Sequence, residues 1–338
     1  MVDFDWAGLD EPALMERNIR SLGLAIEGSG LERYVSQLYD ELAAKGLVFK
    51  PPCHVGDEWF VPVGIPAIFI PFYLVHDRLR KLERSIILDV EGGTQKWFMQ
   101  LMRHEAAHAY SYAYRLQRKK KWQEAFGLAS TEEDEFYRPR PFSHSYVIHL
   151  EDWYAQAHPD EDFAETFAVW LTPGHNWRKR YKGWKALHKL EYVDSLMKSL
   201  AGKPPVHTPS YRVRDYDCLN LKLKTFYARK RKLFEEFYPD FYDKELQSLF
   251  PALPEGVASV PAARFLRDHR RQIRDTISRW TSEKKFRVQE LLSRLTERCG
   301  ELGLSVAVDS PTIDMDVATY ITTLVMNQRF TGKFSRTI

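Results

Sequence analysis

The sequence lacks a long hydrophobic run. No stretch approaches the roughly 18 consecutive apolar residues that a membrane-spanning helix needs, and we therefore expect no membrane association. Its first residues, MVDFDWAGLDEP, carry acidic side chains where a secretory signal peptide carries basic ones. Together these two absences predict a cytoplasmic location.

Cysteine is scarce as well. The chain has three cysteines, Cys53, Cys218 and Cys299, and they lie far apart. An odd number of cysteines at such spacing supports neither a disulfide framework nor a zinc site of the CxxC type. We expect them to be reduced and structural.

Length and composition predict a folded protein with more than one domain. The chain has 338 residues, of which 44% are hydrophobic and 28% are charged. These proportions are typical of globular proteins, and single cores usually stop growing near about 250 to 300 residues. The best linker candidate is AGKPPVHTPS. We place the boundary near residue 203, which gives domains of residues 1–202 and 203–338.

Hydrophobic periodicity predicts three parts in the first domain. Residues 1–50 form a helical lead-in with helices over 11–28 and 30–46. Residues 51–93 form a β-rich part with the runs WFVPVGIPAIFIPFYLV and RSIILDVEGG. Residues 94–202 carry the site helices, which we expect over 94–126, 160–172 and 184–200, with a strand near SYVIHLE.

The C-terminal part, residues 203–338, is predicted to be mostly helical and basic. We expect helices over 223–238, 261–280, 286–302 and 316–328, and a strand over 304–309. In the helix over 261–280 the apolar stripe comprises Leu266, His269, Ile273, Ile277 and Trp280.

The stretch RHEAAHAYSY, residues 103–112, is the first candidate for chemistry. In a helix, residues four apart project from one face, so His104 and His108 can present their imidazoles to one metal ion. Glu105 lies beside them without coordinating the ion. A metal that acidifies water together with a carboxylate that accepts its proton is what a hydrolase needs. The alternative is two histidines on an ordinary helix surface.

The stretch HPDEDFAETFAVW supplies candidates for the third ligand that a catalytic zinc needs. Glu161 and Glu165 also lie four apart on one helical face, among large apolar residues that indicate burial. Buried carboxylates need partners. One of the two can therefore bind the ion while the other accepts a hydrogen bond from a ligand histidine.

These motifs resemble those of a known family. HEAAH followed by EDFAETFA is similar to the gluzincin metallopeptidases. More closely, about residues 15–200 resemble a family of bacterial zinc-binding metallopeptidases. Some members of that family begin with a cysteine-rich zinc ribbon, which this chain does not have. The stretches that carry the resemblance are DEWFVPVGIPAIFIPFYLVHDRL, DVEGG, LMRHEAAHAY, WYAQAHPDEDFAETFAVWLTP and KLEYVDSLM.

The resemblance implies a zincin-like α+β fold with a mostly helical C-terminal extension. It also implies one Zn²⁺ per chain, with His104, His108 and Glu161 as ligands and Glu165 as the acid that orients a histidine. Asp160 and Asp162 are alternative ligands. The implied substrate is a peptide or protein.

Tyr154 enters through a second resemblance. The catalytic domain of anthrax lethal factor has a similar EFFAE stretch, and seven residues before its ligand stands a tyrosine that stabilises the oxyanion. Tyr154 occupies that position in this sequence. A phenol that donates to the developing oxyanion is physically reasonable. The alternative is that Tyr154 is a packing aromatic.

Several other features receive an ordinary interpretation. His149 and His158 flank the second motif, and structural roles are favoured over roles in substrate binding. DVEGG could end an edge strand that pairs with an extended substrate, or it could be a simple turn. The basic tracts RLQRKKKW and ARKRK are favoured as solvated helix faces, and we do not expect nucleic-acid binding. The C-terminal part could contact a protein partner.

The sequence therefore predicts a zinc-dependent peptidase in which Glu105 is the general base. One alternative is a binding or scaffold protein that keeps the fold but not catalysis, and Cys53 as a fourth metal ligand would favour it. Another alternative is a zinc hydrolase that acts on a non-peptide or isopeptide amide.

Overall fold

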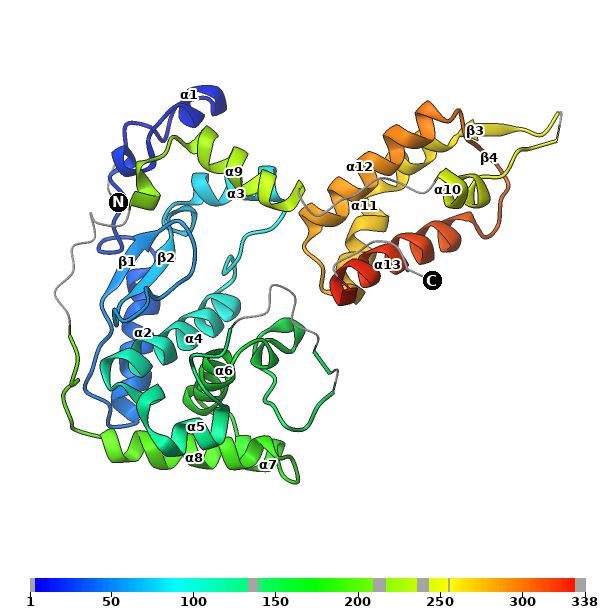
Figure 1. Ribbon diagram of the computed structural model, residues 1–338. Helices are drawn as coiled ribbons and strands as arrows, with labels where there is room; N and C mark the ends of the chain where they lie inside the picture. The colour runs from blue at the N-terminus through cyan, green and yellow to red at the C-terminus, as the bar shows by residue number, and fades with distance from the viewer. Residues whose placement is uncertain are drawn as a thin grey trace. The chain divides into compact units, whose positions relative to one another are not determined.

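The computed structural model describes residues 4–132, 139–140, 142–208, 217–235, 243–254 and 256–331. They form two compact units, the first of residues 1–86 and 90–226 and the second of residues 87–89 and 227–338 (Figure 1). The division falls inside helix α9 (Leu223–Glu235), later than the predicted boundary near residue 203. The start of α9 belongs to the first unit because the Leu223 amide donates to the Arg17 carbonyl at 2.9 Å.

The described residues of the first unit are mostly helical and include one small sheet, so the chain is of mixed α and β content. Before the site helices its elements are α1 (Glu11–Met15), η1 (Ile19–Leu22), α2 (Glu32–Ala44), β1 (Cys53–Gly56), β2 (Ile68–Pro71), η2 (Phe72–Leu74) and α3 (Asp77–Ile87). From there to α9 they are α4 (Gln95–Ala113), η3 (Leu116–Arg118), α5 (Lys120–Phe126), η4 (Glu151–Gln156), α6 (Pro159–Leu171), α7 (Trp177–Arg180), α8 (Ala186–Leu200) and η6 (Asp217–Asn220).

Helix α4 lies in the middle of this unit (Figure 1). It packs against α2 and β2 and also against α6, and α8 in turn packs against α6. Strands β1 and β2 run parallel, with Cys53 opposite Ile68. All four residues of β2 are buried, which explains why its sequence is apolar throughout rather than alternating.

The local sequence sets the ends of the two site helices. Thr94 caps α4 by accepting a hydrogen bond from the Trp97 amide at 3.3 Å. The helix stops at Ala113 because Arg115 adopts a left-handed φ of 51°, so the predicted helix over 94–126 is interrupted before α5. In α6 Pro159 occupies the first turn, where a missing amide hydrogen costs nothing.

Two strand predictions are wrong. Residues 84–87 of the run RSIILDVEGG form the end of α3, in which Leu79, Leu82 and Ile87 are buried at helical spacing. Residues 145–150 form no strand either. Their backbone is satisfied by side chains, since the Tyr181 hydroxyl lies 3.1 Å from the Ile148 amide and 3.3 Å from its carbonyl oxygen.

Other predicted elements are confirmed with shorter bounds. The helix predicted over 160–172 is α6, and the one over 184–200 is α8. The lead-in helix predicted over 11–28 is wrong as a single element. Only Glu11–Met15 form an α-helix, the chain is extended at Asn18 before η1, and Gly23 ends η1 in a left-handed conformation.

The second unit has its own core. It contains α10 (Asp243–Leu249), β3 (Ser259–Pro261), α11 (Ala262–Thr281), α12 (Lys285–Glu301), β4 (Ser305–Ala307) and α13 (Ile313–Thr331). Strands β3 and β4 pair antiparallel, and a cluster of buried residues from Leu246 to Val325 fills the space between the helices. Helix α10 and strand β3 had no counterpart in the sequence prediction.

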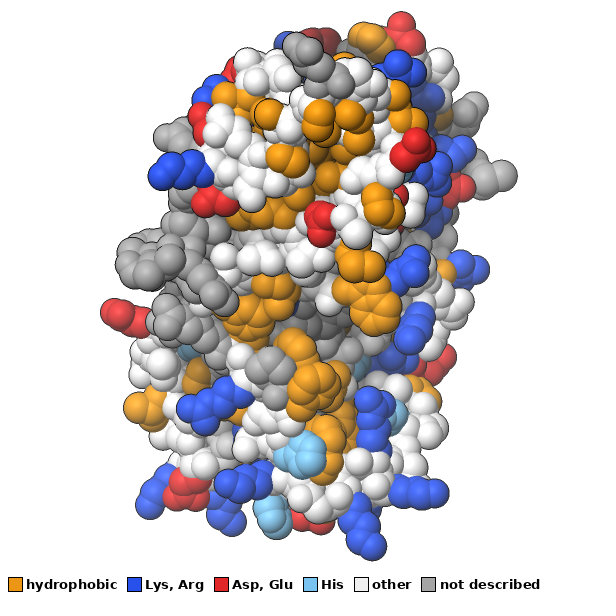
Figure 2. Space-filling view, turned by 90° about the vertical axis from the view of Figure 1, so that its right-hand side faces the viewer, with side chains coloured by type: hydrophobic (Ala, Val, Ile, Leu, Met, Phe, Trp, Pro, Cys, Tyr) orange, Lys and Arg blue, Asp and Glu red, His pale blue; other side chains and the backbone are white. Residues whose placement is uncertain are grey.

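One predicted core residue of this unit lies at the surface. Leu266, Ile273 and Ile277 are buried as expected, but the side chain of Trp280 is 79% exposed. Figure 2 shows hydrophobic side chains gathered on a face of the second unit. Among the described residues of the second unit, the exposed large hydrophobic side chains are those of Val257, Trp280, Val308 and Met315. In the described ranges, no helix is both long and apolar enough to cross a membrane.

Candidate metal centre

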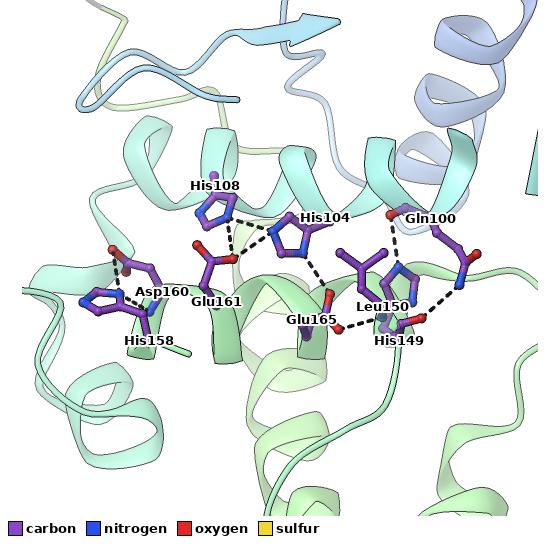
Figure 3. Close-up of polar contacts among 9 residues, drawn as sticks. All are labelled: Gln100, His104, His108, His149, Leu150, His158, Asp160, Glu161 and Glu165. Atoms are coloured by element: carbon purple, nitrogen blue, oxygen red, sulfur yellow. Dashed lines mark hydrogen bonds and ion pairs between the residues drawn. The ribbon is translucent and has the colours of Figure 1, made fainter. Parts of the chain in front are cut away.

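Helices α4 and α6 bring three potential metal ligands together. His104 and His108 lie one turn apart on α4, and Glu161 projects toward them from the first turn of α6 (Figure 3). The Nε2 atoms of the two histidines are 3.1 Å apart. Glu161 Oε2 lies 2.9 Å from Nε2 of His104 and 3.4 Å from that of His108. This trio is a group that could hold a metal ion.

The spacing of these three atoms fits a tetrahedral ion. Metal–nitrogen bonds of about 2.0–2.1 Å in tetrahedral geometry place ligand atoms roughly 3.3 Å apart. Glu161 Oε2 is also buried and, among the described residues, lacks a hydrogen-bond partner of acceptable geometry. Two imidazole nitrogens and a carboxylate oxygen that converge on one point are a donor set that a metal ion can bind once it displaces the protons of the histidines. The side chains of His108 and Glu161 remain 15% exposed, which leaves the cluster accessible from one side.

Glu165 fixes the orientation of His104. The Nδ1–H of His104 donates to Glu165 Oε1 at 2.9 Å, which leaves Nε2 with its lone pair directed at the cluster. The other oxygen, Oε2, accepts a hydrogen bond from the Leu150 amide at 2.8 Å. Glu165 itself is fully buried. The structure thus separates the two acids, because Glu161 faces both histidines and Glu165 faces the far side of one ring.

His149 has a structural position beside this contact. Its Nε2–H donates to the Gln100 carbonyl at 3.0 Å, and the Gln100 side chain donates back to the His149 carbonyl at 2.9 Å (Figure 3). Burial lowers the pKa of His149. Gln100 was missed in the sequence, although it lies four residues before His104 on the same helical face. The contact of the Leu150 backbone amide with Glu165 could not be predicted from the sequence, because every residue except proline has such an amide.

Glu105 lies beside the cluster on α4 and is 7% exposed. Burial raises the pKa of its carboxyl, while the two histidines act in the opposite direction. Within the described part of the chain its carboxylate accepts no hydrogen bond from the protein. A buried carboxylate with a raised pKa and free lone pairs can accept a proton from a small molecule.

Tyr154 lies near the ring of His104. It projects from η4, and the centroids of the two rings are 5.7 Å apart with an interplanar angle of 41°. The structure therefore brings Tyr154 to the cluster, together with the five residues predicted from the two motifs. Its role as an oxyanion donor stays a prediction.

The alternative ligands Asp160 and Asp162 do not join the cluster. The Asp162 carboxylate lies 2.5 Å from Nζ of Lys189, and burial raises its pKa to about 7. The Asp160 carboxylate lies 3.9 Å from His158 Nδ1. His158 caps α6, since its Nδ1 accepts from the Asp160 amide at 3.1 Å and its Nε2–H donates to the Thr131 carbonyl at 2.9 Å. These contacts give His158 a structural role.

Cys53 and DVEGG have no part in the cluster. The Cys53 thiol lies on β1 beside the Pro51 carbonyl and the Tyr39 hydroxyl, and burial raises its pKa to about 12. The residues of DVEGG form a turn rather than an edge strand. Gly92 has a φ of 76°, and a Cβ there would lie 3.0 Å from the ring of Trp59. The glycine is therefore needed for the turn itself.

Comparisons with protein-family models, with curated proteins and with solved structures give no match for this chain. The resemblance to zinc-binding metallopeptidases consequently stays a prediction from the sequence motifs. What the site can do is argued below from its own geometry.

Proposed function

We propose that the first unit is a zinc-dependent peptidase of zincin-like fold. The observation that carries this proposal is the buried carboxylate of Glu105, which accepts no hydrogen bond from the residues that the structure describes and lies beside the convergent His104, His108 and Glu161. A metal site that only stabilises a fold has no use for such a carboxylate. It also tends to be closed by a fourth protein ligand, and Cys53 does not supply one here.

Each residue has a defined task in this proposal. When bound, one zinc ion per chain would acidify a water molecule and polarise the substrate carbonyl. Glu105 accepts the proton of the attacking water and passes it to the leaving amine. Glu165 holds the His104 ring through its Nδ1–H. Tyr154 donates its hydroxyl to the oxygen that gains negative charge as the carbonyl is attacked.

Two further functions use the same residues. The site could hydrolyse a non-peptide or isopeptide amide, because the same base and metal serve both reactions. The fold could also persist as a binding or scaffold protein without catalysis. We favour hydrolysis of peptides or proteins in the cytoplasm, with the basic helical second unit as a surface for substrate or a protein partner. We do not propose a nucleic-acid ligand.

The test compares the zinc-loaded wild type with Glu105→Gln in a cell lysate, and new protein N-termini are identified by mass spectrometry. We expect cuts with the wild type only, while both proteins bind one equivalent of zinc. The variant removes the proton acceptor but none of the three ligands. Equal cutting by Glu105→Gln would contradict the proposal.

Lack of cutting by either protein would favour the scaffold or the amide-hydrolase alternative. Release of amine from acylated lysine or from isopeptide-linked peptides, measured with the same two proteins, separates these two. A Glu161→Ala variant serves as the metal control, because it should lose most of the bound zinc.

A further inference from the structure

Two large aromatic residues, one of which directly precedes Tyr154 in the chain, have strained backbones. Phe142 has a φ of 60° and Trp153 a φ of 53°, and both values lie in the left-handed region that bulky side chains rarely adopt. Such conformations persist only where the surrounding structure imposes them, and they cluster at functional sites. Their coincidence in two residues that contact each other calls for an explanation.

The two rings form a pair that is open to solvent. Their centroids are 5.7 Å apart, and the planes are nearly perpendicular at 73°. This edge-to-face arrangement is favourable for aromatic rings. It does not bury the pair, because Phe142 remains 78% exposed and Trp153 only half-buried. A strained backbone that displays an aromatic ring to solvent gains nothing for folding.

A side chain from η4 holds the pair in place. The Gln156 carboxamide oxygen accepts from the Arg140 amide at 2.8 Å, and its nitrogen donates to the Arg140 carbonyl at 3.1 Å. Arg140 lies two residues before Phe142, and Gln156 lies three residues after Trp153 on η4. The two segments are thus joined by a two-way hydrogen bond that acts like a rung between strands.

The aromatic pair is joined to the cluster of metal ligands through η4. Trp153 directly precedes Tyr154, whose ring lies 5.7 Å from that of His104. Because Trp153 and Tyr154 are consecutive residues of η4, the aromatic pair follows directly on the residue that contacts His104. The chemistry of that surface is apolar and aromatic.

The geometry points to Phe142 and Trp153 as the surface that receives a large apolar side chain of the substrate, next to the bond that is cut. This inference rests on the proposed function and names its substrate class. Peptides with Phe, Tyr, Trp, Leu or Met beside the cleaved bond are preferred, because their side chains cover the exposed ring of Phe142.

The experiment uses the full-length zinc-loaded protein and a pool of tryptic peptides from a cell lysate, with new termini read by mass spectrometry. The variants are Phe142→Ala and, as the conservative replacement, Phe142→Leu. Val206→Ala is the matched control, since Val206 is also a large exposed hydrophobic residue, at 68% exposure. It lies at another place in the fold, where its amide donates to the Ala113 carbonyl at the end of α4.

We expect the wild type and Val206→Ala to cut beside large apolar residues. Phe142→Ala should lose about tenfold in kcat/KM on those peptides relative to peptides with small residues at the cut. Phe142→Leu should recover most of this preference. Cuts without any preference for apolar residues, or a preference unchanged in Phe142→Ala, would overturn the inference and leave the peptidase proposal standing.

Failure of the peptidase proposal gives a different result. If no protein cuts, the zinc-loaded Glu105→Gln form and its Phe142→Ala double variant are incubated with the same pool, and the retained peptides are identified. Enrichment of large apolar residues that depends on Phe142 supports the surface without hydrolysis. Equal retention by both forms rejects it.

Discussion

At the scale of single residues, the imidazoles of His104 and His108 hold protons unusually tightly. Burial alone would lower the pKa of both rings, but the carboxylates of Glu161 and, for His104, Glu165 outweigh it. The pKa of each histidine is therefore raised above its ordinary 6.5. Glu161 stays ionised, because the two histidines lower its pKa further than burial raises it.

Zinc must displace these protons, and its affinity should depend on pH accordingly. Below the raised pKa values the Nε2 atoms are occupied by hydrogen, so zinc uptake near neutral pH should release up to about two protons. The apparent affinity should fall by about one to two decades per pH unit as the solution is acidified. Calorimetric zinc titrations in buffers of different ionisation enthalpy measure the release. Equal affinity at about pH 6 and pH 8 would refute this arrangement.

At the scale of elements, a buried ion pair joins α2 to the metal-binding helix α4. Arg103, the residue before His104, donates from Nε and Nη2 to the two oxygens of Glu41 at 2.7 Å each. The two side chains are only 9% and 6% exposed. Gln37 adds a third contact, since its amide donates to Glu41 Oε1 at 2.9 Å. Such a bidentate pair specifies the rotation of α4 about its own axis.

Removal of one partner should be costly. Glu41→Ala leaves the Arg103 guanidinium buried without its counter-charge and should lower the free energy of unfolding by about 3–5 kcal/mol. The double variant Arg103→Met/Glu41→Leu should lower the free energy of unfolding much less, because no charge remains buried. Urea unfolding of the zinc-loaded chain measures both. Glu124→Ala is the control, since its pair with Lys120 is exposed and should contribute at most about 0.5 kcal/mol.

The helices were predictable to a degree that the loops and strands were not. His104 and His108 on α4, and Glu161 and Glu165 on α6, follow from four-residue spacing in apolar surroundings. The segment before η4 looked like a strand because its residues are β-branched and aromatic. Its backbone instead bonds the side chains of Tyr181 and Glu165, which no local pattern reveals. Contacts between residues this far apart in the sequence cannot be predicted from the spacing of residues within one element.

The same limit explains the error at Trp280. Its place in the apolar stripe of α11 predicted burial, yet the buried residue of the last turn is Thr281, whose hydroxyl donates to the Ile277 carbonyl at 2.8 Å, and Trp280 lies at the surface. The Arg103–Glu41 pair was missed for a related reason. The two residues are 62 positions apart, and each alone resembles a solvated charge.

At the scale of the whole molecule, the two units have separate cores. The core cluster of the second unit contains only residues between Leu246 and Val325, and the candidate metal centre lies wholly in the first unit. Ligand binding stabilises only the structure that forms its site. The chain should therefore respond to metal in one part and not in the other.

Differential scanning calorimetry of the full chain should resolve two transitions. Zinc at a hundred times its dissociation constant should raise the midpoint of one by several degrees, since it adds about 2.7 kcal/mol to a unit of this size. A chelator should reverse the shift, and the other transition should not move. A single transition, or a shift of both, would show that the units unfold together.

The two oxygens of Glu165 have a consequence for how mutations combine. One oxygen accepts from His104 and the other from the amide of Leu150, four residues before Tyr154. A single carboxylate thus holds both the ligand histidine and the segment that leads to Trp153 and Tyr154 on η4. Replacements at Glu165 and at Tyr154 will not have independent effects. The loss of activity in the double variant will differ from the sum of the losses in the two single variants. Replacements at Glu165 will change metal retention and substrate preference at the same time.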